Sequence, residues 1–182
     1  MEPRIILDSK KFSLTIERLC HQLIENHKDF AKTAIIGIQP RGIHFSNRIQ
    51  KRLLAINPNL KFDYGFMDIT FYRDDFRRRE KPLKPSNTEI NFSVEGKRVI
   101  LIDDVLFTGR TIRAAMDALL DYGRPEQVEL LVLVDRRFTR DLPIQADYVG
   151  KTIDSIESEH VKVEWKEVDK TDAIWILNEN EK

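Results

Sequence analysis

Two adjacent carboxylates, Asp103 and Asp104, stand where a buried strand is predicted to end. The four residues before them, Val99–Ile102, are all apolar, which is typical of a strand covered on both faces. After two further apolar residues, the segment 107–111 (FTGRT) leads into a helical pattern. In open α/β sheets, ligands bind beyond the carboxyl ends of the strands. The two carboxylates are therefore predicted to face a ligand.

Residues 107–111, called the phosphate loop below, suit an anion. A helix start offers unpaired backbone N–H groups and a favourable dipole. Gly109 allows close approach of the backbone, and Thr108 and Thr111 add hydroxyl donors. Asp103 and Asp104 repel a phosphate but suit sugar hydroxyls or a metal ion. A turn and a helix cap would explain Thr-Gly alone, whereas all thirteen residues of Val99–Thr111 favour a ribose-phosphate site. A P-loop is excluded, because its Gly-x-x-x-x-Gly-Lys-Ser/Thr pattern is absent.

Composition limits the remaining classes of protein. A chain of 182 residues suits one domain, and 41% apolar with 33% charged residues indicates a globular protein. The 30 basic and 30 acidic residues balance, which argues against a protein that mainly coats nucleic acid. No apolar run is long enough for a membrane, and no secretory signal is recognisable. A lone cysteine, Cys20, is expected to be buried, and the cytoplasm is the expected location.

Apolar periodicity predicts the elements that position these residues. Helices are expected over 13–30, with Ser9 or Ser13 as the cap, and over 42–54 and 111–122; strands are expected over 33–38, 64–72, 99–102 and 128–134. Such alternation predicts a parallel α/β sheet. The charged, proline-containing stretch 73–85 is expected to be a mobile loop or arm, and the tail from Val149 should form short peripheral strands.

The phosphate loop with its two acids resembles the phosphoribosyl-diphosphate (PRPP) motif of type I phosphoribosyltransferases. GIQPRG at 37–42, DITFYRDD at 68–75 and LPIQADYVGK at 142–151 extend the resemblance to the pyrimidine operon regulator/uracil phosphoribosyltransferase family. The implied fold is a single domain over 1–182: a mostly parallel sheet flanked by helices, with a small hood. The flexible loop would span about 73–88 and the base-binding hood about 135–160.

By this resemblance, uracil and PRPP would give UMP and pyrophosphate, with Mg²⁺ bound mainly through PRPP and without direct protein ligands. Catalysis would fall to Asp103 and Asp104. The other implied roles are phosphate and ribose binding by Phe107, Thr108, Gly109, Arg110 and Thr111; pyrophosphate binding by Pro40, Arg41, Gly42 and Arg73; and base binding by Tyr148, Val149 and Arg140.

Two positions bear on the base. Phe107 stands where purine-salvaging relatives typically carry an aspartate, and it has no proton to exchange, which favours a pyrimidine. Tyr148 aligns with an aromatic residue that stacks on the base, but a half-buried core aromatic is an equal alternative. In the diphosphate loop, Pro40 replaces the usual threonine or serine.

Members of the family often also bind the leader RNA of pyrimidine-biosynthesis transcripts, and UMP strengthens that binding. Arg18, His21 and Lys151, together with Arg140, match that basic pattern, whereas Glu17 and Gln145 depart from it. Two alternatives therefore stay open: a nucleotide-sensing RNA regulator with little catalysis, and a purine phosphoribosyltransferase. A homodimer or higher oligomer is expected, with no membrane partner.

Overall fold

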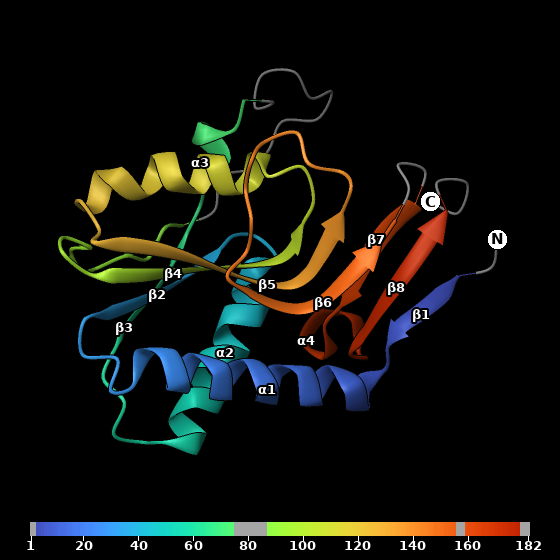
Figure 1. Cartoon of the computed structure of the whole chain (residues 1–182), viewed down its shortest axis with the longest axis horizontal. Coiled ribbons are helices and arrows are strands. Elements are labelled where there is room, and N and C mark those ends of the chain that lie inside the picture. Colours follow the sequence, from blue (N-terminus) through green and yellow to red (C-terminus); the bar gives the residue numbers. More distant parts are fainter. Residues whose placement is uncertain (1–2, 75–86, 156–158, 179–182) are drawn as a thin grey trace.

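The computed structural model describes residues 3–74, 87–155 and 159–178. Over these residues, five parallel strands form the central sheet in the order β3-β2-β4-β5-β6 (Figure 1). The strands are β2 (Thr33–Ile38), β3 (Asp63–Met67), β4 (Arg98–Leu106), β5 (Gln127–Arg137) and β6 (Tyr148–Asp154). All six residues of β2 are buried, as expected for a strand covered on both faces. The prediction of a parallel α/β sheet is confirmed.

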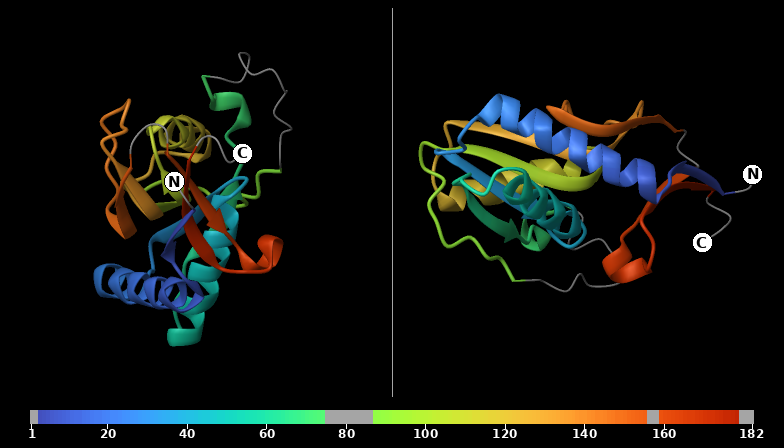
Figure 2. Two further views of the ribbon diagram at one scale, coloured as in Figure 1. Left: turned by 90° about the vertical axis from the view of Figure 1, so that its right-hand side faces the viewer. Right: turned by 90° about the horizontal axis from the view of Figure 1, so that it is seen from below.

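Helices cover both faces of this sheet. Helices α1 (Ser9–His27) and α2 (Gly42–Ile56) lie across one face, as Figure 2 shows from below, and α3 (Arg110–Leu119) lies on the other. Two apolar cores result, one shared by the sheet with α1 and α2, and one shared with α3. Short 3-10 turns, η1 (Thr70–Tyr72) and η2 (Leu120–Tyr122), end the predicted strand 64–72 and the predicted helix 111–122 early.

A second, antiparallel sheet stands beside the first, built from the described strands β1 (Arg4–Leu7), β8 (Ala173–Asn178) and β7 (Glu159–Glu164), with the short helix α4 (Lys166–Asp169) between β7 and β8. We call this sheet the hood below. The expected base-binding hood over about 135–160 stays a prediction. The end of β5 and all of β6 pair within the main sheet, so the tail from Val149 is only partly peripheral. Most of the expected flexible loop, at 75–86, lies outside the described residues.

Local contacts explain two boundaries. Helix α1 is capped by Asp8, whose carboxylate accepts from the Lys11 N–H at 2.8 Å, so neither Ser9 nor Ser13 is the cap. Helix α2 starts at Gly42, where a Cβ would lie 2.6 Å from the Ile102 carbonyl oxygen. The absence of a side chain at Gly42 thus lets the start of α2 pack against the end of β4.

Cys20 is buried, as predicted. Within the described ranges, no helix is both long and apolar enough to cross a membrane.

Candidate active site

Asp103 and Asp104 lie near the carboxyl end of β4 and are 7% and 8% exposed. Burial, reinforced by the neighbouring carboxylate of Asp104, raises the pKa of Asp103 well above its usual value. Burial also raises the pKa of Asp104, although Arg41 opposes this shift. Two like charges with little access to water favour any partner that neutralises or hydrogen-bonds them. The pair is therefore suited to ribose hydroxyls or a cation.

Two segments distant in the sequence, one with Arg41 and Gly42 and one with Arg73, lie beside this pair and the phosphate loop. Arg41, between β2 and α2, places its Nε 3.2 Å from Asp104 Oδ2 and also donates to the Val163 carbonyl of the hood. Arg73, after η1, places an Nη 3.4 Å from Thr111 Oγ1. Gly42 packs against Asp103, since a Cβ would lie 3.2 Å from Asp103 Oδ1. The predicted pyrophosphate-binding segment thus adjoins the predicted ribose-binding carboxylates, and the peptide bond before Pro40 is cis.

The phosphate loop joins β4 to α3. Gly109 has a φ of 91°, in the left-handed region that favours glycine, and α3 begins at the next residue. Thr108 and Thr111 are half-buried beside it. The Arg110 side chain turns away to the surface, where it pairs with Asp74 at 2.5 Å and Asp141 at 3.0 Å. Arg110 therefore contributes its backbone rather than its guanidinium to the predicted phosphate site.

A pocket of about 340 Å³ opens beside Asp104, between the main sheet and β7. That volume is at the lower end of the range for small-molecule sites. The described residues that line it are Arg41, Asp104, Val105, Phe107, Arg136, His160, Val161, Lys162 and Val163. Phe107, assigned to the phosphate loop from the sequence, thus also faces the pocket beside Asp104.

Arg136 forms one wall of the pocket with Phe107. Its Nε donates to Ser155 Oγ and its Nη2 to the Glu159 carbonyl, both at 2.9 Å. Burial lowers the pKa of this guanidinium. Arg136 falls within the base-binding stretch expected from the sequence, about 135–160, but it was not singled out as a site residue, although its place at the end of a fully apolar strand is a usable signal. The β7 residues have no such local signal, because only the folding of the hood brings them to the pocket.

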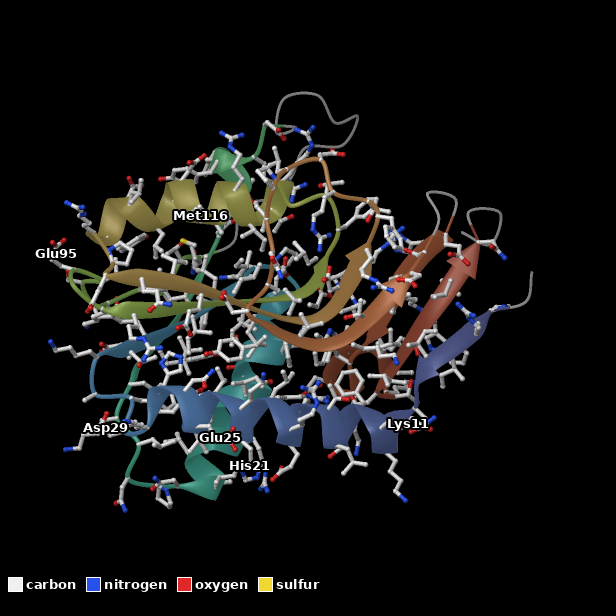
Figure 3. All side chains as sticks on the ribbon, in the orientation of Figure 1. Lys11, His21, Glu25, Asp29, Glu95 and Met116 are labelled. Carbon is white, nitrogen blue, oxygen red and sulfur yellow. The ribbon has the colours of Figure 1, made fainter. Side chains whose placement is uncertain are left out.

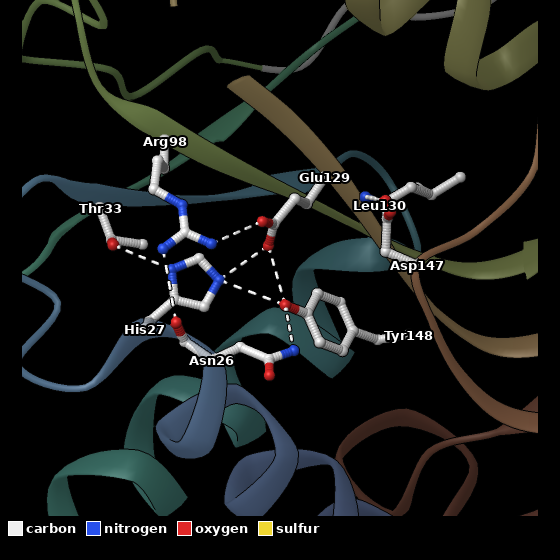
Figure 4. Close-up of polar contacts among 8 residues, drawn as sticks. All are labelled: Asn26, His27, Thr33, Arg98, Glu129, Leu130, Asp147 and Tyr148. Atoms are coloured by element: carbon white, nitrogen blue, oxygen red, sulfur yellow. Dashed lines mark hydrogen bonds and ion pairs between the residues drawn. The ribbon is translucent and has the colours of Figure 1, made fainter. Parts of the chain in front are cut away.

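Tyr148, Val149 and Arg140 are not among the described residues that line the pocket. Tyr148 is 3% exposed, and its hydroxyl lies 2.9 Å from Glu129 Oε2 and 3.0 Å from Asn26 Nδ2 (Figure 4). Of its two sequence interpretations, the structure therefore favours the core aromatic. Val149 packs on the core that α3 covers, and Arg140 contacts the phosphate loop, as described below.

The residues expected to bind RNA lie on α1 and β6. Arg18 donates to the carbonyls of Val149 and Gly150 at 2.9 and 2.8 Å, so it joins α1 to β6. His21 projects from the side of α1 away from the sheet (Figure 3), and its Nε2 lies 3.1 Å from Glu17 Oε1. Glu17 also pairs with Arg52 of α2. Lys151 is exposed on β6, next to Gly150.

The comparisons with known proteins agree with this geometry. The family model described as phosphoribosyl transferase domain matches residues 4–168. The chain belongs to this family. It is 44% identical over 175 residues to the bifunctional protein PyrR of Halalkalibacterium halodurans, covering 95% of this chain and 96% of that protein. It is 42% identical over 181 residues to the bifunctional protein PyrR of Enterococcus faecalis, with both chains covered in full (100%). The resemblance predicted from the motifs is confirmed.

Solved phosphoribosyltransferases share the fold. The hypoxanthine phosphoribosyltransferase of Trypanosoma cruzi superposes with a TM-score of 0.72 at 17% identity, covering 96% of each chain. The hypoxanthine phosphoribosyltransferase of Staphylococcus aureus superposes with a TM-score of 0.69 at 23% identity, covering 94% of this chain and 90% of the other. At such identities the likeness establishes the phosphoribosyltransferase fold and leaves the base open.

Proposed function

We propose that this phosphoribosyltransferase joins uracil to PRPP, giving UMP and pyrophosphate. The observation that carries the proposal is that Asp104 and Phe107 line one pocket beside the start of α3. Phosphate would bind at the helix start, ribose hydroxyls at the carboxylates, and the base in the pocket. Because Phe107 cannot exchange a proton, this pocket suits a base that needs no acid at that position. The relatives named bifunctional protein PyrR support the same assignment.

The carboxylates would act by electrostatics. As the bond between the anomeric carbon and pyrophosphate breaks, the leaving group takes the electron pair and the ribose becomes cationic. Asp103 and Asp104, desolvated and close together, would favour that charge. Arg41, half-exposed at the pocket mouth, and Arg73, beside Thr111, would bind the departing anion. Arg41 also pairs with Asp104. One side chain would therefore connect the pyrophosphate site with the ribose site.

The oxygen donors at this site suit a Mg²⁺ ion that is bound to the phosphate oxygens of PRPP. Within the described ranges, no three His, Cys, Asp or Glu side chains are grouped to hold a metal ion. Asp103 and Asp104 supply at most part of an oxygen shell, and Mg²⁺ normally completes such shells with water and phosphate oxygens. When bound, the ion would neutralise charge on the pyrophosphate. We therefore propose that Mg²⁺ binds mainly through PRPP.

Incubation with PRPP, Mg²⁺ and single bases tests the proposal. Chromatography should detect UMP with uracil. Asp104→Asn should abolish turnover while circular dichroism stays unchanged, and the exposed Asp154→Asn should leave turnover intact, since Asp154 only pairs with Arg137. Conversion of hypoxanthine or guanine without conversion of uracil would establish the purine alternative instead.

Leader RNA binding is a second proposed function. The observation favouring it is the pairing of Glu17 with Arg52 and His21, which offsets the carboxylate that the sequence placed against the RNA. Arg18 also binds the carbonyl of Gly150, the residue before Lys151. We therefore place the proposed RNA surface along α1 and the adjoining strand β6. A cytoplasmic location and a homo-oligomer stay predictions.

A gel shift with pyrimidine-gene leader RNA, with and without UMP, tests this function. Binding should weaken as salt rises, because basic side chains contact phosphates. Lys151→Gln should weaken it further, whereas Lys32→Gln, exposed ahead of β2, should not. Absent binding, or binding that salt leaves unchanged, would reject the RNA function and leave catalysis untouched.

A further inference from the structure

Arg140 is surrounded by backbone acceptors next to the phosphate loop. Its Nε donates to the Ile144 carbonyl at 3.0 Å, and its Nη1 to the carbonyls of Leu106 at 3.3 Å and Arg136 at 3.0 Å. The Phe107 carbonyl also accepts from Nη1, whose two hydrogens are thus shared among three carbonyls, and Nη2 pairs with the Asp135 carboxylate. The side chain is only 23% exposed. Its hydrogen bonds therefore serve the fold of the loop.

The residues after Arg140 continue this contact. The Thr108 carbonyl accepts from the backbone N–H groups of Asp141 at 3.0 Å and Leu142 at 3.2 Å. The carbonyls of Leu106, Phe107 and Thr108 are thus bound in succession by residues 140–142. Gly109 completes the packing, since a Cβ there would lie 3.2 Å from the Ile144 side chain.

The direction of these carbonyls determines the direction of the amides. In a planar trans peptide the N–H points opposite to the C=O, and the one cis bond in the described residues is Gln39–Pro40. Carbonyls held toward residues 140–142 therefore turn the N–H groups of Phe107, Thr108 and Gly109 to the other side. Successive amides that face the same way form an anion-binding concavity. The start of α3 adds its own N–H groups there.

We propose that Arg140 is a positioning residue, which holds the phosphate loop with its amides turned toward the 5′-phosphate of the substrate. The inference rests on the proposed function in that the loop binds a ribose phosphate, but it does not depend on the base. It replaces the base-binding role that the sequence suggested for Arg140, since Arg136 lines the pocket and Arg140 is not among its described lining residues.

Arginine suits this role better than lysine. Its planar fork donates in several fixed directions at once, whereas an ammonium group is a compact point charge with three donors. Asp135, at the end of β5, anchors the fork and offsets its charge. Asp135 also pairs in register with Leu106, so the anchor and the loop are attached to neighbouring strands.

The test compares Arg140→Gln and Arg140→Lys with Arg137→Gln, a control whose exposed guanidinium pairs with Asp154. Calorimetry measures the Kd of ribose 5-phosphate, and steady-state kinetics measures KM for PRPP and for uracil. Arg140→Gln should raise both the Kd of ribose 5-phosphate and the KM for PRPP about tenfold or more, since charge-assisted contacts to the loop are lost. Arg140→Lys should be intermediate. KM for uracil and all constants of Arg137→Gln should stay near wild type.

A loss of uracil affinity with unchanged ribose 5-phosphate binding would overturn the inference and restore a base-binding role. Unchanged constants in both Arg140 variants would also overturn it. If Arg140→Gln unfolds, Arg140→Lys decides the matter, because it keeps the charge. A wild-type protein that binds ribose 5-phosphate but does not convert uracil would reject the proposed base and leave the role of Arg140 standing.

Discussion

The guanidinium carbon of Arg136 lies 4.0 Å from the centroid of the Phe107 ring, in a cation–π contact. Ser155 and the Glu159 carbonyl accept hydrogen bonds from this guanidinium and hold it in place. The guanidinium in turn positions the Phe107 ring. Phe107 is still 39% exposed. The pair thus joins the phosphate loop to the proposed base pocket.

Phe107→Leu should raise KM for uracil about 2- to 5-fold, because a cation–π contact at a partly exposed site contributes roughly 0.5–1 kcal/mol. The chain supplies a matched control in Phe138, which lies under Arg137 at 5.3 Å but is 82% exposed. Phe138→Leu should leave KM unchanged in the same steady-state assay. Equal effects of the two substitutions would contradict a role for Phe107 in the base pocket.

Asp103→Asn should stabilise the protein at neutral pH while reducing turnover. The pKa of Asp103 is raised in the folded state by burial and by Asp104, above its usual 3.8. The folded state therefore favours the protonated acid, and stability is lost as the pH rises through the raised pKa. Asparagine avoids that loss and still accepts a hydrogen bond from the Asp104 N–H, which lies 2.9 Å from Asp103 Oδ1.

Urea unfolding at several pH values measures this effect. Asp103→Asn should exceed wild type by about 1 kcal/mol or more near pH 8, since one pKa unit corresponds to roughly 1.4 kcal/mol. The difference should shrink as the pH falls below about 4, where the carboxyl is protonated in both states. A variant that is less stable than wild type at neutral pH would show that the charged form of Asp103 is stabilised instead.

His27 should make wild-type stability fall in mild acid. Its Nε2 lies 2.7 Å from Glu129 Oε2 and its Nδ1 3.1 Å from Thr33 Oγ1, in the buried network of Figure 4. Burial lowers the pKa of His27 below its usual 6.5, although Glu129 opposes the shift. Folding thus favours the neutral ring. Its contribution to the free energy of unfolding is present above pH 6.5 and is lost as the pH falls below that value. Arg98, which pairs with Glu129 at 2.8 Å, also repels the positive charge that His27 would carry when protonated.

Unfolding free energies near pH 7.5 and 5.5 test this dependence. Wild type should lose about 1 kcal/mol over that interval, and His27→Gln should lose less. His21→Gln, at an exposed position, should keep the wild-type slope. Parallel slopes for wild type and His27→Gln would assign the acid sensitivity to another group.

Tyr148→Phe should lower stability without changing the kinetics for uracil. Burial raises the pKa of Tyr148 to about 12, and removing its hydroxyl takes one hydrogen-bond partner from the buried carboxylate of Glu129 and one from the exposed Asn26. A loss of about 1 kcal/mol is expected, mainly from the buried carboxylate. Tyr148→Leu, which also removes the aromatic ring, should leave KM for uracil within about twofold. A large rise in that KM would return Tyr148 to the base site.

Much of the fold and part of the site could be predicted from local patterns. Fully apolar runs such as Val99–Ile102 mark buried parallel strands, and residues that follow them, such as Asp103 and Asp104, reach the ligand edge of the sheet. Short peripheral strands were expected in the tail, but their pairing into the hood was not predictable in this way. Its strands β1 and β8 pair although they lie at opposite ends of the chain, and no local periodicity records such pairing.

The sequence by itself determined the carboxylate pair, the phosphate loop and the parallel α/β sheet, because those features depend on neighbouring residues and on the order of strands and helices. The phosphoribosyltransferase fold was implied by the resemblance of the motifs. Only the tertiary structure decided what the long side chains do. It placed Tyr148 in a buried network, Arg136 against Phe107, and Arg140 on the carbonyls of the phosphate loop. An aromatic ring or a guanidinium can serve a ligand or the fold equally well, and its choice depends on which acceptors the folded chain brings within reach.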